Sequence, residues 1–449
     1  MANPGPLALL RASLVRRALL RMAVASALLC VWPAAGQKLE SLPIDPALQR
    51  PPELKDHFLA DRLPEKPTVA PAVTIALDPL DFAAPNPVYI GHRYSMVSLD
   101  FLDDDHLLFT FRVPGLIRRT PGAQEDDAEH RIRAVVLGLP SGKVQAEALW
   151  LLHDRSRYIW PLKDGRFLFR DRNLLFESDA ELQLKPFLSF PGPLLTIETD
   201  PEEQYLLTNS REPVAKAAKA SNPDAGDDDQ ETSTAPDLVM RILRLDSGQV
   251  AGVNRVRTVR HLAFNSKGYL DSLQGVNDRW LVQLSDFKGG SRDLGSVFSL
   301  CQPKLEFISE TELLATTCKT DGGYGMIAMT TGGQMLWQDS TSGYTVWPIV
   351  RRSSSGLRVL RESLAVTREI GTFWSLDSQI IKAQRVRVLD AATGNVAFEA
   401  TADPVLDAGG NAAISPSGRR VAILSKGAIE VFNLPPPPDL PSVHSAAAP

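Results

Sequence analysis

The sequence predicts an all-β protein built from many short antiparallel hairpins. Its 449 residues include 34 prolines and 30 glycines, so turns are frequent and short strands are favoured over long helices. Between residues 87 and 434, short apolar runs alternate with clusters of Asp, Gly, Asn and Ser. With 44% hydrophobic and 22% charged residues, the composition is that of a globular protein and excludes a polytopic membrane protein, a fibre and wholesale disorder.

Two types of hairpin recur along this region. The first type has a polar turn between apolar strands, and its seven copies turn near residues 103–105, 164–165, 200–201, 277–278, 309–310, 353–356 and 416–418. The second type has Gly or Asp in a tight turn, and its copies cover residues 133–148, 174–187, 241–253, 326–338 and 385–400. Alternation of the two types resembles a single β-propeller with seven four-stranded blades. The competing fold is a pair of β-sandwich domains divided at residues 212–236.

The last part of the chain carries the clearest family resemblance. The segments LDAATGNVAFEA and ISPSGRRVAILSKGAIEVFNL resemble repeats of secreted bacterial WD40-like and quinoprotein-like β-propellers, over about residues 384–434. Asp390, Thr393, Gly394 and Phe398 match the turn motif of that superfamily. The resemblance implies that the Thr-Gly pair packs the hairpin and that the aromatic ring packs between blades. It implies architecture, without assigning an activity.

Residues 1–36 are interpreted as a signal peptide. They contain four arginines and no acidic residue, and the uncharged run Met22–Gly36 is shorter than the roughly 20 apolar residues that span a bilayer. Ala34 and Gly36 provide the small residues of a cleavage site, so cleavage between Gly36 and Gln37 is expected. The protein is therefore predicted to be periplasmic or extracellular. Export by the general route and by the twin-arginine route both remain open.

Three further segments lie outside the expected blade region, residues 87–434. Residues 37–86 are rich in proline and include a candidate short helix at 53–62. They are expected to supply the strand that closes the ring, from residues 69–77, and residues 87–90 are the other candidate for this strand. Residues 212–236 lack aromatic side chains and are predicted to be a disordered insertion. Residues 435–449 begin with proline and end in small residues, which predicts a disordered tail.

The two cysteines outside the signal, Cys301 and Cys318, are predicted to form a disulfide after export. A tight turn at Ser309-Glu310 would place them directly opposite each other on neighbouring strands. A wider turn would shift the register and leave them as a diagonal pair. Two buried free thiols are the alternative.

No motif in the sequence assigns a catalytic, cofactor-binding or metal-binding residue. Asp103, Asp104, Asp105 and His106 resemble a metal cluster, but aspartates on a hairpin turn are more simply explained by the turn itself. The run at 227–229 lacks the spacing of a calcium loop. The remaining candidates are histidines without metal-ligand spacing, namely His92, His130, His153 and His261. A site assembled from distant loops remains open.

The charge balance disfavours nucleic acid as a partner. The full chain carries a formal net charge of -5, and removal of the arginine-containing signal makes the mature protein more acidic. The pairs Arg351-Arg352 and Arg419-Arg420 are interpreted as solvated charges at strand ends.

The expected function is therefore a non-enzymatic module that binds a protein or ligand of the bacterial cell envelope. Such a protein is predicted to be a monomer without a cofactor and without a membrane span after signal removal. The alternative is a propeller enzyme, either a quinone-dependent dehydrogenase or a lactonase or hydrolase. Metal analysis and an absorption spectrum would distinguish these classes.

Overall fold

The computed structural model describes most of the chain beyond residue 61. The described ranges are 62–85, 96–114, 129–153, 157–212, 237–259, 261–369, 378–406 and 409–437. All of them belong to the second of two compact units, residues 56–449, and the first unit is residues 1–55. The predicted signal peptide, its cleavage site, Cys30 and the candidate helix at 53–61 lie outside the described residues. So do the insertion at 213–236 and the tail from 438 onward.

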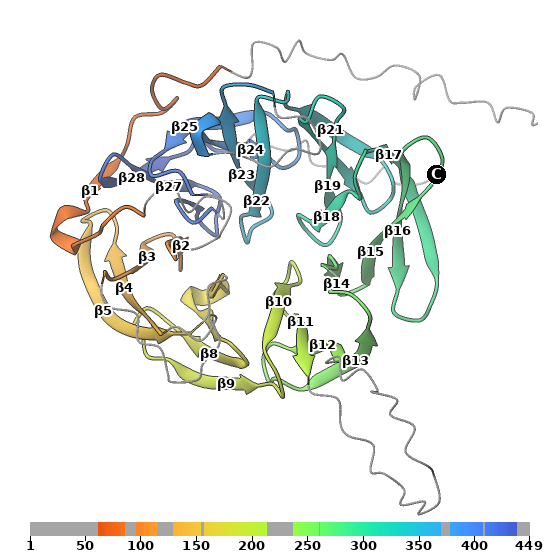
Figure 1. The fold of residues 1–449 in the computed structure, drawn as a ribbon, viewed down its shortest axis with the longest axis horizontal. Coiled ribbons are helices and arrows are strands. Elements are labelled where there is room, and N and C mark those ends of the chain that lie inside the picture. The colour runs from red at the N-terminus through yellow and green to blue at the C-terminus, as the bar shows by residue number, and fades with distance from the viewer. Residues whose placement is uncertain are drawn as a thin grey trace, which may run out of the picture. The chain divides into compact units, whose positions relative to one another are not determined.

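The described residues form seven four-stranded antiparallel sheets. In six sheets the strands follow one another in chain order, and Figure 1 shows the seven sheets arranged around a common centre. The protein is a seven-bladed β-propeller, so the predicted fold is confirmed. The two-sandwich alternative is wrong, because β11 (Tyr205–Glu212) and β12 (Asp237–Arg244) flank the insertion and pair within one sheet.

The blades are numbered here in chain order, and the strands of each run from the centre outward. Blades 1 to 3 comprise β2 (Ser98–Phe101), β3 (His106–Arg112), β4 (His130–Gly138) and β5 (Lys143–Leu152); β6 (Ile159–Pro161), β7 (Phe167–Asp171), β8 (Leu174–Ser178) and β9 (Lys185–Ser189); and β10 (Leu194–Thr199), β11, β12 and β13 (Val250–Val256). Blades 4 and 5 comprise β14 (Phe264–Asn265), β15 (Gly268–Gln274), β16 (Arg279–Asp286) and β17 (Ser291–Phe298); and β18 (Lys304–Phe307), β19 (Glu312–Cys318), β20 (Tyr324–Thr330) and β21 (Met335–Ser340).

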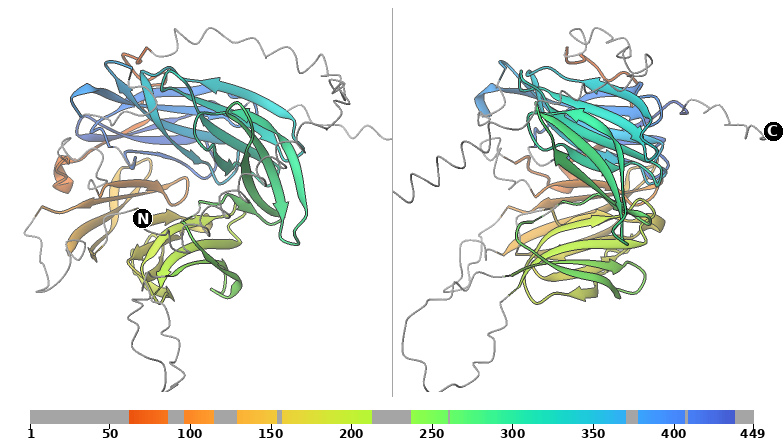
Figure 2. Two further views of the ribbon diagram at one scale, coloured as in Figure 1. Left: turned by 45° about the vertical axis from the view of Figure 1, so that its right-hand side comes forward. Right: turned by 90° about the vertical axis from the view of Figure 1, so that its right-hand side faces the viewer.

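Blades 6 and 7 follow the same plan, except that blade 7 draws on both ends of the chain. They comprise β22 (Thr345–Arg352), β23 (Arg358–Val366), β24 (Ile381–Asp390) and β25 (Val396–Ala402); and β26 (Ala412–Ile414), β27 (Arg420–Ser425), β28 (Ala428–Asn433) and β1 (Val73–Ala76). Three short 3-10 turns complete the described secondary structure: η2 (Asp78–Leu80), η5 (Lys163–Gly165) and η6 (Ser378–Ile380). The side views show the strands running roughly along the axis of the ring (Figure 2).

Strand β1 closes the ring. It pairs antiparallel with β28, with Val73 opposite Val431 and Ala76 opposite Ala428. This strand falls within the expected segment 69–77, and the other candidate, 87–90, lies outside the described residues. Its buried residue Ile75 packs in the cluster that joins blades 7 and 1. Closure pairs the outer edge of β28, which would otherwise be a free sheet edge.

The turn near residues 277–278 does not belong to the first hairpin type. It joins β15 to β16, which are the second and third strands of blade 4, whereas the inner hairpin of that blade turns at Ser266-Lys267. The inner strand β14 has only two residues, so it is too short to show an alternating pattern in the sequence. For this reason the sequence pattern places the turn at 277–278 in the wrong hairpin of this blade.

The core of the protein lies between adjacent blades. Phe398 on β25 is fully buried and packs against Phe432 on β28, with ring centroids 4.7 Å apart. Gly394 has φ of +68°, and a Cβ there would meet the Trp337 ring of blade 5 at 2.6 Å. Only glycine allows both that conformation and that approach. The role that the family resemblance implied for Phe398 is confirmed, whereas Gly394 makes its close approach to the neighbouring blade.

Candidate functional site

The first strands of the seven sheets surround a channel with a volume of about 1070 Å³. Every sheet contributes lining residues, from Asp100 on β2 to Ile414 on β26. Ligand pockets commonly have volumes of roughly 300–1,000 Å³, so the channel can hold a small molecule or a short peptide segment.

Charged side chains of both signs line the channel. The acidic residues are Asp100, Glu198, Glu203, Asp271 and Glu306, and the basic residues are Arg157, Arg170, Lys304, Arg351 and Arg352. Some of these charged side chains bind residues of another blade, whereas others make their contacts closer to their own strand. This difference separates residues that hold the ring together from residues that are available to a ligand.

Arg351 connects blade 6 to blade 1. Its Nη1 atom lies 3.3 Å from Oδ1 of Asp100, and its Nε atom lies 3.9 Å from Oε1 of Glu362 on the neighbouring strand β23. Asp100 is 3% exposed and also accepts a hydrogen bond from Ser98 Oγ at 2.5 Å. Because blade 7 lies between blades 6 and 1, Arg351 fastens the two blades that flank the site of ring closure.

Glu362 is a fully buried carboxyl group behind the channel wall. Gln384 Nε2 donates to it at 2.9 Å, and Gln384 Oε1 accepts from Asn411 Nδ2 of the blade 6–7 connection at 2.8 Å. Burial raises the pKa of Glu362 to about 7, and nearby Asp100 adds to the effect, whereas the guanidinium of Arg351 opposes it. The group therefore titrates near neutral pH.

Arg352 reaches across the channel from blade 6 to blade 3. Its Nη1 and Nη2 atoms donate to the main-chain carbonyls of Pro201 and Asp200 at 3.2 and 3.0 Å. Burial lowers the pKa of Arg352, an effect that Glu203 opposes. The expectation that Arg351 and Arg352 are solvated strand-end charges is therefore wrong. Inner strands bring their ends to the channel, where an arginine can reach other blades.

Arg157 occupies a different environment. It lies two residues before the start of β6 and is exposed to the channel. Its guanidinium stacks over the Trp160 ring, with Cζ 5.2 Å from the ring centroid. Its Nε atom donates to the carbonyl oxygen of Ile159 at 2.9 Å. The surrounding walls remove water and, together with repulsion from Arg351, lower the pKa of Arg157 to about 10.

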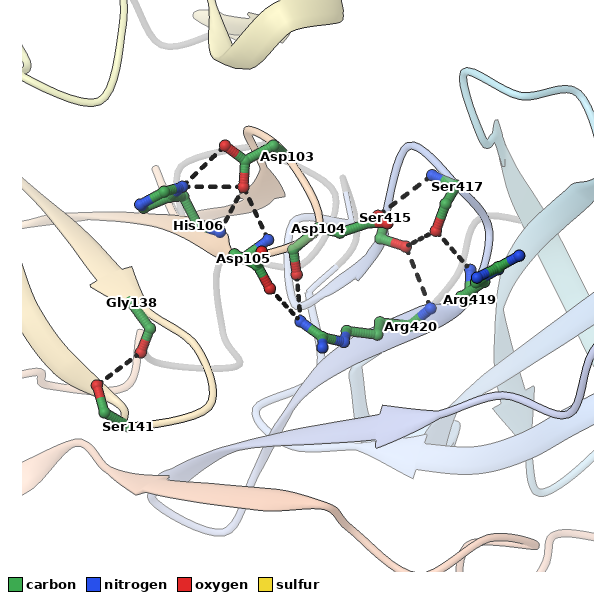
Figure 3. A network of polar contacts seen from close by, with 10 residues as sticks. All are labelled: Asp103, Asp104, Asp105, His106, Gly138, Ser141, Ser415, Ser417, Arg419 and Arg420. Atoms are coloured by element: carbon green, nitrogen blue, oxygen red, sulfur yellow. Dashed lines mark hydrogen bonds and ion pairs between the residues drawn. The ribbon is translucent and has the colours of Figure 1, made fainter.

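The acidic turn at 103–105 has a structural role, as the sequence indicated. Asp103 Oδ1 accepts from the main-chain N–H groups of Asp105 and His106 at 2.7 and 2.8 Å (Figure 3). The turn also contacts blade 7, because Arg420 Nη1 lies 3.0 Å from Asp105 Oδ1. Arg420 is thus a link between blades, whereas Arg419 is exposed as expected.

The histidines do not gather into a metal site in the described part of the chain. His130 is buried, His153 pairs with Asp171 at 2.9 Å, and His261 Nδ1 lies 2.8 Å from Glu198. Among the described residues, no group of three or more His, Cys, Asp or Glu side chains is placed to hold a metal ion. His92 and the aspartates at 227–229 lie outside those residues.

Cys301 and Cys318 are joined by a disulfide in the structure, with their Cα atoms 5.6 Å apart. The register differs by one residue from the directly opposed pairing expected for a tight turn. In the ladder of β18 and β19, Lys304 lies opposite Thr316, because three residues, 309–311, form the turn between Ile308 and Glu312. Cys301 precedes β18, where the chain has left the ladder and can approach Cys318.

Sequence reasoning missed the two buried carboxyl groups that bind Arg351 at the channel wall. Asp100 lies inside the apolar run 97–102, and Glu362 lies inside β23, whose nine residues are all buried. A charged residue within an apolar strand is the signal that could have identified them, since burial of a charge requires a partner. The partners themselves come from blades that are distant in sequence.

No protein-family model matches the chain, and no curated protein matches it. Solved structures similar to it include the C-terminal WD40 domain of Sif2, with 10% identity, a TM-score of 0.40, and coverage of 82% of this chain and 99% of that one. A chain of the mitotic checkpoint complex has 11% identity, a TM-score of 0.43, and coverage of 84% and 98%. A putative TolB from Agrobacterium tumefaciens has 12% identity, a TM-score of 0.36, and coverage of 65% and 94%.

Because these similarities are low, the fold is described from the sheet topology of the chain itself. Among the described residues, no helix has the length and apolar character needed to cross a bilayer.

Proposed function

We propose that this propeller is an exported, non-enzymatic binding module that holds a ligand or protein segment of the cell envelope in its central channel. The observation that carries this proposal is a channel of about 1070 Å³ lined from all seven sheets. Arg351 and Arg352 tie its wall together across the ring, so the cavity is preformed. A preformed cavity binds without the entropic cost of ordering its own walls.

Binding in the channel is tested by narrowing it. Val259 lines the channel and is 37% exposed, whereas Val253 on β13 is 64% exposed and lies on the outer strand of blade 3. The wild-type protein, Val259→Trp and the matched control Val253→Trp would be incubated with an extract of the envelope. Native mass spectrometry would then identify bound compounds.

A ligand retained by the wild type and by Val253→Trp, but lost from Val259→Trp, is the expected result. Retention by all three proteins, or by none, would contradict binding in the channel. Turnover of a lactone or an alcohol by the purified wild type would contradict the non-enzymatic part of the proposal. We expect the protein to be a monomer without affinity for nucleic acid, as gel filtration and filter binding would check.

The proposed export is supported by the Cys301–Cys318 bridge, since disulfides persist in oxidising compartments. We expect N-terminal sequencing of protein from the envelope fraction to begin at Gln37. A chain that begins at Met1 and is recovered from the cytosol would refute export.

A further inference from the structure

We propose that Arg157 is the anchor of the channel and that it binds the carboxylate of an organic monoanion that carries an apolar chain. This inference rests on the proposed function, because it assumes that the channel is where the ligand lies. It adds the chemical class of the ligand and the residue that recognises it.

The Arg157 side chain is already oriented by its neighbours. The Trp160 ring beneath it is 7% exposed and is fixed by a hydrogen bond from Nε1 to the carbonyl oxygen of Ile197, 3.1 Å long. The guanidinium stacks on this ring, and the hydrogen bond from Nε to Ile159 sets its rotation. An oriented side chain loses little further freedom when it binds.

The two terminal nitrogens of the Arg157 guanidinium remain available to a ligand. Nη1 and Nη2 of Arg157 make no hydrogen bond or ion pair with any residue in the described ranges, and the side chain is exposed to the channel. By contrast, Arg351 and Arg352 use their Nη atoms to reach Asp100, Asp200 and Pro201. The planar fork of a guanidinium matches the two oxygens of a carboxylate.

The charges around Arg157 favour a monoanion. Arg351 lies close enough to Arg157 to disfavour its charge, and an incoming anion would offset this repulsion by pairing with the guanidinium. Asp100 and Glu306 have the opposite effect, because they favour the charged form of Arg157 and so raise its pKa. These two carboxylates would repel a ligand with two negative charges more strongly than a ligand with one. A carboxylate is therefore favoured over a phosphate monoester.

Apolar side chains of the channel are placed to contact the remainder of the ligand. Leu195, Leu262, Leu305 and Ile349 line the same channel and are partly exposed to it. Contact with an apolar chain would remove this surface from water. Two sources fit this chemistry, a free alkyl carboxylic acid and the C-terminus of an apolar peptide.

The test uses matched probes that differ only in charge. Isothermal titration calorimetry at neutral pH would compare hexanoate with hexanamide, and the peptide acetyl-Ala-Leu-Leu with its C-terminal amide. Hexyl phosphate would test the preference for one negative charge. We expect at least one acid to bind about tenfold or more tightly than its amide, which corresponds to one charge-assisted hydrogen-bonding contact. Which acid binds better identifies the source.

The variants separate recognition from folding. Arg157→Gln should abolish the preference for the acid, and Arg157→Lys should retain only part of it, because an ammonium lacks the planar fork. Arg419→Gln, at an exposed position on the turn before β27, is the control and should bind like the wild type. Thermal unfolding of Arg157→Gln checks that the fold is intact.

Equal binding of acid and amide, unchanged binding by Arg157→Gln, or tighter binding of hexyl phosphate would overturn the assignment. Failure of every probe would also overturn it, since Arg157 would then hold only water. If no probe bound but Val259→Trp still lost the compound that the wild type retains from the extract, binding in the channel would remain supported. Only the carboxylate assignment would then be wrong. If Val259→Trp retained that compound, the proposed function itself would fall.

Discussion

At the scale of single residues, Arg351 illustrates how the ring is held together. It is the cation shared by two carboxylates, Asp100 and Glu362, which are 3% and 0% exposed. A buried charge that loses its partner keeps its desolvation penalty. The contribution of Arg351 to stability is therefore expected to far exceed that of a surface ion pair.

We predict that Arg351→Met lowers the free energy of unfolding by about 3 kcal/mol, the usual effect of removing one partner from a buried ion pair. The substitution keeps an unbranched side chain of similar length but leaves Asp100 and Glu362 without their shared cation. Urea denaturation measures the loss. The control, Arg419→Met at an exposed position, should change stability by less than about 0.5 kcal/mol. Equal effects of the two substitutions would refute the role given to Arg351.

Glu362 predicts a pH dependence of stability. Its pKa is raised from 4.5 to about 7 in the folded protein, so between these values the folded state binds more protons than the unfolded state. This contribution to stability is complete below the unfolded pKa and is lost as pH rises through about 7. Glu362→Gln removes the titration while keeping a polar group beside Gln384.

We therefore expect Glu362→Gln to gain stability relative to the wild type between about pH 5 and about pH 8, by up to about 3 kcal/mol. Urea denaturation at a series of pH values would measure this difference. Glu65→Gln, at an exposed position in the N-terminal segment, provides the control. A constant difference between wild type and Glu362→Gln across this range would show that Glu362 does not titrate there.

At the scale of elements, each blade is two hairpins joined edge to edge, and neighbouring blades share the apolar core between them. Blade 5 has an additional covalent constraint, since the Cys301–Cys318 bridge ties its second strand to the segment that enters it from blade 4. This segment includes Gln302 and Lys304, which line the channel. The bridge therefore restrains part of the channel wall as well as the blade.

We predict that the double variant Cys301→Ser/Cys318→Ser is less stable than the oxidised protein by about 3 kcal/mol, the chain-entropy value for a loop of this size. Thermal unfolding would measure the change, and the variant should still fold because β18 and β19 are also paired through their own backbone ladder. Thiol counting on the denatured mature wild type should find no free thiol. Two free thiols would refute the bridge.

At the scale of the whole molecule, closure depends on a strand from one end of the chain pairing with a strand from the other. Strand β1 covers the edge of β28, and Ile75 and Leu77 bury apolar surface between blades 7 and 1. The C-terminal contribution continues just past β28, where the carbonyl of Pro435 accepts a hydrogen bond from Arg358 Nη2 at 2.7 Å. The described end of the chain at 437 therefore still includes one contact to blade 6.

We predict that deletion of residues 37–90 causes aggregation, because it exposes the edge of β28 and part of the core. The single substitution Ile75→Asp should act in the same direction by placing a charge in that core. Deletion of residues 438–449 is the control and should leave the protein monomeric, with a melting temperature within a few degrees of the wild type. Light scattering and thermal unfolding would measure both outcomes, and a soluble monomer without residues 37–90 would show that β1 is dispensable.

The sequence by itself predicted the all-β class, the seven-bladed fold and, as one of two candidates, the ring-closing segment. These properties depend on local patterns, since alternation of apolar residues and turn-forming residues defines hairpins without reference to distant parts of the chain. The pattern failed at β14, where two residues are too few to show alternation.

Only the tertiary structure determines which residues come together in the candidate site. Arg351 meets Asp100 and Arg352 meets Pro201 across separations of 251 and 151 residues. Such contacts depend on how the blades are arranged around the ring, and the sequence near each arginine does not indicate its partner. For the same physical reason, the open Nη atoms of Arg157 could be distinguished from the bonded arginines only after the ring had closed around them.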